Sequence, residues 1–145
     1  MGSQEKLLAH IEKEMKEIYV DQNGLINNML EPEFLEASDE EGFVRFGFKV
    51  KPWAVNKSGT VHGGILATSC DCVMALFARY FAGGNFAPTV SIDMKYVRPL
   101  RTGDEFTVTA MKVSAGRRMT QLKCEIREKE TEKIIATGAG VFINA

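Results

Sequence analysis

The segment from residue 59 to residue 78 carries one charged side chain, Asp71, although 26% of the whole chain is charged, which corresponds to about five charges in twenty residues. Apolar residues at helical spacing predict a helix over residues 63–82, with apolar groups on more than one of its sides. A helix that is apolar most of the way round is buried, so the chain must fold around it. At about 1.5 Å per residue, this helix would be nearly 30 Å long.

Alternating apolar and polar residues predict strands on both sides of this helix in the sequence. The predicted strands cover residues 33–38, 43–50, 88–98, 103–115, 117–128 and 133–143. Short turns join the last four, so we expect consecutive strands to be antiparallel neighbours. With a leading amphipathic helix over residues 4–19, the predicted fold class is α+β, a curved antiparallel sheet wrapped around one long central helix.

The length of 145 residues and the hydrophobic content of 45% are those of one ordinary globular domain. We expect a single domain over residues 1–145, with residues 1–30 as a leading helix and loop. The N-terminus lacks a basic start followed by an apolar core, so no secretory signal is expected and the predicted location is cytoplasmic. His62, Asp71 and two glycines interrupt the apolar run, so no membrane insertion is expected either.

The cysteines, histidines and charged residues of the sequence argue against a metal ion and a nucleic acid as partners. Cys70, Cys72 and Cys124 lack zinc-finger spacing and the chain has only two histidines, so we expect buried thiols and no metal site. Residues 1–50 carry 5 basic and 11 acidic side chains, whereas residues 95–133 carry 10 basic and 6 acidic ones. That basic excess is too small for a nucleic-acid surface. It fits either a scattered solvated surface or a modest anion site for a phosphorylated small molecule.

The start of the predicted central helix, His62-Gly63-Gly64, is suited to binding an oxygen atom. Glycines allow a ligand to approach the backbone closely. The first N–H groups of a helix have no partner within the helix, and the helix dipole favours negative charge there. The Gly63 N–H is therefore a candidate donor to a carbonyl oxygen that develops negative charge during a reaction.

Asp71 has no basic residue three or four positions away, so no ion pair within the helix is available to it. It is either a buried carboxylate bonded to backbone or to a hydroxyl, or a base or nucleophile in acyl transfer to water. Gly63 and Asp71 lie eight residues apart on one helix, roughly 12 Å, so they cannot both touch one carbonyl. If both act, Asp71 must come from a second copy of the chain, which predicts a site across a symmetric dimer interface.

Residues 56–71, with the sequence NKSGTVHGGILATSCD, resemble the signature of hotdog-fold acyl-CoA thioesterases of the phenylacetic-acid-degradation (PaaI-like) type. That signature is an Asn, then His-Gly-Gly, then an acidic residue nine positions after the His. Residues 90–99 resemble the next strand of that family, and Gly103-Asp104 resembles the turn after it.

The resemblance implies a hotdog fold, a homodimer that usually pairs into a homotetramer, and hydrolysis of an acyl-CoA thioester. Coenzyme A is then part of the substrate, and no metal or redox cofactor is implied. Asp71 matches the family's acidic catalytic residue, acting as base or nucleophile, and Gly63 matches the residue whose N–H polarises the carbonyl. Asn56 and His62 match positions that shape the site, and Ser91 matches a position that often holds a hydroxyl near the water. Asp71 and Ser91 would face Asn56 and Gly63 of the other subunit.

Each of these positions also has a structural interpretation. His62 is as well suited to brace the turn before the helix, Ser91 to be an ordinary strand hydroxyl, and Asp93 to form a surface ion pair. For the coenzyme A phosphates, arginines at strand ends or turns are candidates because arginine suits bidentate phosphate contacts. The candidates for binding coenzyme A are Gly64, Arg98, Arg101, Arg117 and Arg118, against the alternative of solvated surface.

Two rival functions remain open on the same fold. One is a non-catalytic acyl-CoA binding or sensor protein, and the other is a hydratase or dehydratase, which would normally use a His with its carboxylate. The acyl group is not identified, since aromatic and medium-to-long fatty acyl-CoA both remain possible.

Overall fold

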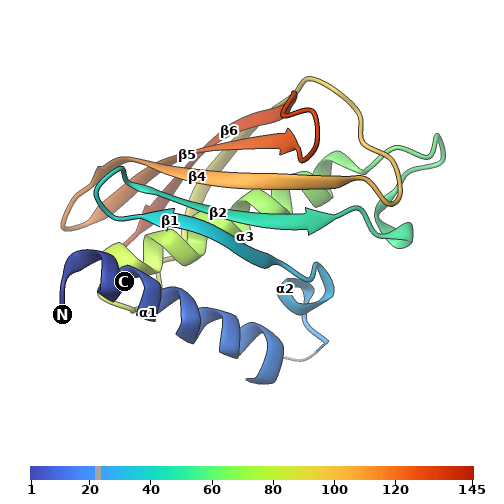
Figure 1. The fold of residues 1–145 in the computed structure, drawn as a ribbon. Helices are drawn as coiled ribbons and strands as arrows, with labels where there is room; N and C mark the ends of the chain where they lie inside the picture. Colours follow the sequence, from blue (N-terminus) through green and yellow to red (C-terminus); the bar gives the residue numbers. More distant parts are fainter. Residues whose placement is uncertain (22–23) are drawn as a thin grey trace.

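The computed structural model describes residues 1–21 and 24–145, and its centre is one antiparallel sheet wrapped around a long helix (Figure 1). The order of strands across the sheet is β1-β2-β4-β5-β6-β3. The strands are β1 (Glu33–Ser38), β2 (Phe43–Lys49), β3 (Thr89–Tyr96), β4 (Glu105–Ala115), β5 (Met119–Glu128) and β6 (Ile134–Ile143). The predicted α+β class, with a curved sheet around a central helix, is confirmed.

The central helix α3 (Gly63–Phe81) lies against one face of the sheet. Leu66, Val73 and Phe77 are buried on the side of α3 that faces the sheet. The apolar residues that alternate along the strands are buried on the facing side of the sheet. By length and composition alone α3 would be able to cross a membrane. Its apolar composition is accounted for by this packing, because the residues that face the sheet form the core.

A glycine in β6 allows the helix to approach the sheet closely. A Cβ atom at Gly140 would lie 3.0 Å from the Met74 Cε atom and 2.9 Å from the Phe142 ring. Such distances are shorter than ordinary van der Waals contact, so a larger residue at this position would force the Met74 side chain or the Phe142 ring to move.

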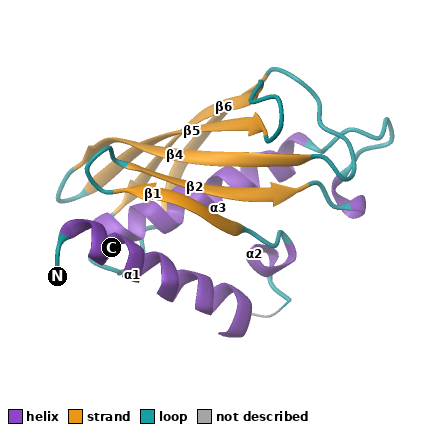
Figure 2. Ribbon diagram, in the orientation of Figure 1, coloured by secondary structure: helices purple, strands orange, loops and turns teal. Residues whose placement is uncertain are grey.

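Four further helical segments accompany α3. The leading helix α1 (Ser3–Lys16) continues as a π-helical turn over Glu17–Asp21, and α2 covers Ile26–Met29. A 3-10 turn, Pro52–Ala54, precedes the loop that leads into α3. Figure 2 shows α1 and α3 on the same side of the sheet, with α3 next to the strands. The predicted helix over residues 4–19 is thus confirmed in place, with its last turn widened.

The expectation that consecutive strands are neighbours is wrong at one place. β3 pairs with β6, whereas β4 pairs with β2 and β5, so the connection over residues 97–104 carries the chain from one edge of the sheet to its interior. The reason is that the β4–β5 and β5–β6 hairpins bring β6, not β4, beside β3. β3 is therefore an edge strand, with one side that no strand of the described residues pairs.

Candidate active site

The loop before α3 is organised by Asn56. Its side-chain oxygen accepts hydrogen bonds from the backbone N–H of Ser58 (2.9 Å) and of Thr60 (3.2 Å), and its side-chain amide donates to the Thr60 hydroxyl (2.9 Å). These bonds use the Asn56 side chain within its own loop. Asn56 is exposed, and its place in the site stays a prediction.

The first turn of α3 presents unpaired backbone donors. The His62 carbonyl accepts from the Ile65 N–H (2.9 Å), so the helix starts at Gly63. Within the described chain, no acceptor bonds to the N–H of Gly63 or Gly64, as expected for the first positions of a helix. The His62 ring is exposed and makes no capping hydrogen bond, so the bracing interpretation has no support from its side chain.

Tyr96, at the end of β3, holds this first turn in place. Its hydroxyl donates a 2.7 Å hydrogen bond to the Gly63 carbonyl, and its ring lies so close that a Cβ on Gly63 would be 3.1 Å from Tyr96 Cζ. Burial raises the pKa of Tyr96, which keeps the hydroxyl protonated as a donor. Sequence reasoning missed this residue, although an aromatic side chain at the end of the strand after the helix was a signal for it.

A cavity of about 360 Å³ opens beside Gly63. It is lined by residues from the helix start and from the segment after β3, namely Thr60, Val61, Gly63, Leu66, Tyr96, Val97, Arg98 and Pro99. Arg98 donates through Nη1 to the Ile134 carbonyl (2.7 Å), which anchors its exposed guanidinium at this cavity. The structure therefore brings together two predicted residues. Gly63 supplies the free N-terminus of α3, and Arg98 supplies a positive charge at the same cavity.

Asp71 lies two helical turns further along α3, away from this cavity. Its side chain is half-exposed, and its Oδ1 accepts a 2.8 Å hydrogen bond from the Thr89 hydroxyl. The structural alternative of a carboxylate bonded to a hydroxyl is thus confirmed, although the burial of Asp71 is only partial. Thr89 is a second residue that sequence reasoning missed.

Ser91 does not meet Asp71 within one chain. It is exposed and alternates with Ile92, which packs against the core, so it lies on the face of β3 turned away from α3. Asp93 lies on the same outer face and forms an ion pair with Lys95 (3.1 Å).

Arg117 and Arg118 belong to the turn between β4 and β5, at the opposite end of the sheet from Gly63 (Figure 1). Their carbonyls accept hydrogen bonds from Asn144, with its side chain on Arg117 (2.9 Å) and its backbone on Arg118 (2.9 Å). Arg101 pairs with the loop before α3 through a bridge to Thr60. Within one chain the arginines that are candidates for binding coenzyme A therefore form two groups, one at each end of α3.

The thiols beside Asp71 are not nucleophiles at neutral pH. Burial, followed by the negative charge of Asp71, raises the pKa of Cys72 to about 12. Cys70 and Cys124 are buried. We expect none of the three to react with iodoacetamide in the folded protein at pH 8, and all three to react in 6 M guanidinium. Mass spectrometry of the alkylated protein measures this, and fast labelling of Cys72 in the folded state would contradict it.

Among residues 1–21 and 24–145, no group of three or more His, Cys, Asp or Glu side chains is placed to hold a metal ion.

Residues 58–135 match the sequence model of the Thioesterase superfamily. The match covers more than half of the chain, so the protein belongs to this superfamily, and its sheet and central helix are the hotdog fold. Acyl-coenzyme A thioesterase 13 of Mus musculus is 35% identical over 92 residues, which are 62% of this chain and 64% of that protein. The matched region thus spans just under two-thirds of that relative.

The solved structures that share the fold include the following two. The PaaI protein of the Escherichia coli phenylacetic acid degradation operon has a TM-score of 0.84 and 20% identity, over 99% of this chain and 96% of its own. The smu.793 protein of Streptococcus mutans, solved bound to acetyl-CoA, has a TM-score of 0.70 and 19% identity, over 78% of this chain and 87% of its own.

Proposed function

We propose that this protein hydrolyses acyl-CoA thioesters to a free acid and coenzyme A. One observation carries the proposal: the same helix of a thioesterase-superfamily chain holds both free N–H groups, at Gly63 and Gly64, and a partly exposed carboxylate, that of Asp71. The acetyl-CoA bound by the Streptococcus mutans structure supports coenzyme A esters as ligands of this fold. The reaction needs no cofactor in this scheme.

In the proposed mechanism, Asp71 takes a proton from water while the water oxygen forms a bond to the thioester carbonyl carbon. The carbonyl electron pair moves to its oxygen, which accepts a hydrogen bond from the Gly63 N–H. Collapse of this intermediate breaks the C–S bond and releases the free acid and coenzyme A thiolate, which takes the proton held by Asp71. Direct attack by the Asp71 carboxylate, followed by hydrolysis of the anhydride, is the alternative. The Thr89 hydroxyl orients the carboxylate in either case.

The site needs two chains, because Gly63 and Asp71 are roughly 12 Å apart along α3. The unpaired edge of β3 offers the contact, since two-fold symmetry pairs two such edges antiparallel. That pairing brings the start of one β3, which holds Thr89 on Asp71, to the end of the other, which holds Tyr96 on Gly63. It also brings the Arg117 end of one chain toward the Arg98 end of its partner. Association of two dimers into a tetramer is the second step of this proposal.

A panel of acyl-CoA esters of increasing chain length, with release of the coenzyme A thiol as readout, tests the activity. Binding without turnover would identify a sensor protein. Hydration of crotonyl-CoA without thiol release would identify a hydratase.

Complementation tests the shared site. We expect Asp71→Asn and Gly63→Val chains to be almost inactive alone, the latter because its side chain obstructs the first turn of α3. After random reassociation, half of the dimers are mixed and each has one intact site, so about a quarter of the wild-type activity should return. Mixed dimers confirmed by mass spectrometry that stay inactive would count against a shared site.

Tyr96→Phe should lower kcat about fivefold with little change in KM. The variant keeps the ring against Gly63 but removes the hydrogen bond to the Gly63 carbonyl, whose net value is about 1 kcal/mol. The Gly63–Gly64 peptide is then held less firmly in the orientation that the reaction needs. Steady-state kinetics measure the effect, and a change in KM alone would show that Tyr96 only shapes the cavity.

A further inference from the structure

The sheet of one chain has a second edge, β1, at the opposite side from β3. An edge strand offers backbone N–H and C=O groups to which a strand of another chain can bind. The proposed shared site uses the edge of β3, so what happens at β1 decides how many chains can join. Unlike β3, β1 is bonded along its outer side by α1 and by the π-helical turn that follows α1.

Gln4, in the first turn of α1, binds the edge of β1 as a neighbouring strand would. Its side-chain amide donates through Nε2 to the Ala37 carbonyl (2.9 Å), and its Oε1 accepts from the Asp39 N–H (2.7 Å). The Ser38 carbonyl, which lies between these two groups, accepts instead from the Gly42 N–H (2.9 Å) in the turn toward β2. The two groups that Gln4 binds therefore lie on the outer side of β1, away from β2.

Tyr19, in the π-helical turn, binds the other end of the same edge. Its hydroxyl donates to the carbonyl of Pro32, the residue before β1 (2.6 Å). Pro32 has no N–H that another strand could use. Burial, followed by the negative charges of Glu31 and Glu33, raises the pKa of Tyr19, which keeps its hydroxyl protonated as a donor.

The helical segment and the strand match in length. From Gln4 to Tyr19 a helix spans about 22 Å, at about 1.5 Å per residue. From Pro32 to Asp39 an extended strand spans about 23 Å, at about 3.3 Å per residue. The two segments run in opposite directions, and Figure 1 shows α1 alongside β1. Side-chain bonds at both ends and a bulge between Phe34 and Glu36 leave no regular stretch of edge for another strand.

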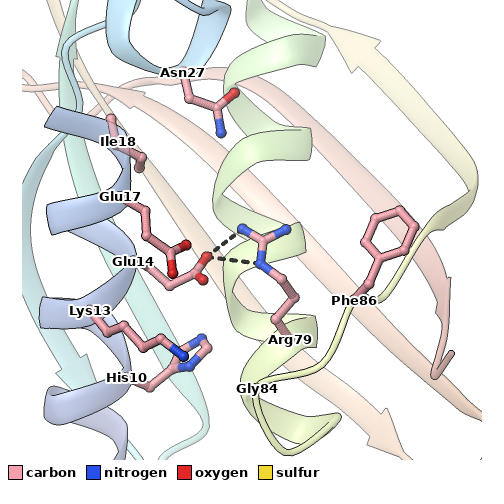
Figure 3. A pocket seen from close by; sticks show the side chains of 9 residues that line it. All are labelled: His10, Lys13, Glu14, Glu17, Ile18, Asn27, Arg79, Gly84 and Phe86. Carbon is pink, nitrogen blue, oxygen red and sulfur yellow. Dashed lines mark hydrogen bonds and ion pairs between the residues drawn. The ribbon is translucent and has the colours of Figure 1, made fainter. Parts of the chain in front are cut away.

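Contacts with the core hold α1 in this position. Leu7 and Ile11 are buried in the core. Arg79 of α3 donates through Nε to Glu14 Oε1 (2.8 Å), as Figure 3 shows, and Glu14 is only 7% exposed. The first turn has no such anchor, because Gly2 at the N-cap provides no side-chain hydrogen bond. Gln4 is thus a position at which the edge can be opened without disturbing the core.

We propose that α1 closes the β1 edge to the β1 edge of a second copy of this chain, so that edge-to-edge pairing is confined to β3. The inference rests on the pairing of two β3 edges in the proposed function. That pairing occupies both β3 edges and leaves one β1 edge at each end of the joined sheet. Open β1 edges would pair by a second two-fold axis, and alternation of the two contacts would add dimers without limit. With β1 closed, growth through sheet edges stops at two chains.

The test opens the β1 edge in the full chain. The double variant Gln4→Gly, Tyr19→Phe removes all three hydrogen bonds to the edge and loosens the first turn of α1, because glycine is a poor helix former. We expect its weight-average mass in sedimentation velocity to rise with concentration, to at least about twice the wild-type value. Lys6→Gly is the matched control, because it places the same glycine in the same part of α1, at an exposed residue, and keeps the Gln4 amide. Its mass should equal that of the wild type.

Hydrogen exchange identifies the contact that forms. In dilute solution the Asp39 N–H should exchange at least about tenfold faster in the double variant than in Lys6→Gly, because its acceptor is gone. As the double variant assembles, residues 33–38 should become protected. Growth without protection of these residues would overturn β1 as the contact. An Asp39 N–H that exchanges equally in both variants, or a wild-type mass of the double variant at every concentration, would overturn the inference.

The same measurements separate this inference from the proposed function. A monomeric wild type would contradict the proposed pairing of β3, whereas closure of β1 would still be supported if the double variant then formed dimers that protect residues 33–38. Should circular dichroism show that the double variant does not fold, Gln4→Ala with Tyr19→Phe removes the same three bonds and keeps a good helix former. That variant is expected to show the same growth and the same protection.

Discussion

Asp71→Asn is expected to lower kcat for acyl-CoA hydrolysis roughly a thousandfold while the protein stays folded. The amide has the size of the carboxylate and its oxygen still accepts from the Thr89 hydroxyl, so the local structure is kept. The amide does not take a proton from water at neutral pH and is a poor nucleophile, so both versions of the mechanism stop. Thiol release measures kcat, and circular dichroism with thermal melting measures the fold.

Asp93→Asn is the matched control for that experiment. Asp93 has the same side chain, lies on the outer face of β3 and pairs only with exposed Lys95 (3.1 Å). We expect its turnover to stay within about a factor of two of the wild type, since exposed ion pairs contribute little. Near-normal turnover of Asp71→Asn, or equal losses in both variants, would remove Asp71 from the mechanism.

Phe77→Ala is expected to lower the free energy of unfolding by about 3–5 kcal/mol, a large part of the stability of a domain of this size. Phe77 is 1% exposed on the sheet side of α3, and its ring centroid lies 4.6 Å from that of Phe81. Truncation leaves a cavity at the centre of the core that the helix and the sheet cannot close without moving apart. Urea unfolding followed by circular dichroism measures the change.

Phe86→Ala serves as the control, because the same atoms are removed from a ring that is 68% exposed. Its free energy of unfolding should change by less than about 0.5 kcal/mol. Equal effects of the two substitutions would mean that α3 is not the centre of the core.

Local patterns were sufficient to predict the elements of this fold. The uncharged run around Asp71 predicted the buried central helix, and alternation predicted all six strands to within a few residues, because both signals lie within one segment. The position of Gly63 at the helix start followed from the glycine pair and from the resemblance to PaaI-like thioesterases. The pairing of β3 with β6 did not follow, because it depends on two hairpins that come later in the chain.

The partners of the candidate site residues required the tertiary structure. Thr89 contacts Asp71 and Tyr96 contacts Gly63 across 18 and 33 residues of sequence. A β-bulge at the start of β3 decides that Thr89 rather than Ser91 lies on the helix side. The Glu14–Arg79 pair joins residues 65 positions apart, and only the packing of α1 on α3 brings them together.

By itself, the sequence determined that one apolar helix with a single carboxylate forms the centre of an α+β domain, since periodicity and composition are local properties of the chain. It also determined that Gly63 and Asp71 are too far apart to act on one carbonyl, because helix geometry converts sequence spacing into distance. Only the tertiary structure decided that Asp71 lies half-buried against Thr89, and that β3 has one edge that no other strand of the described residues pairs. These features depend on which distant segments pack against one another, and that choice is made by the fold as a whole.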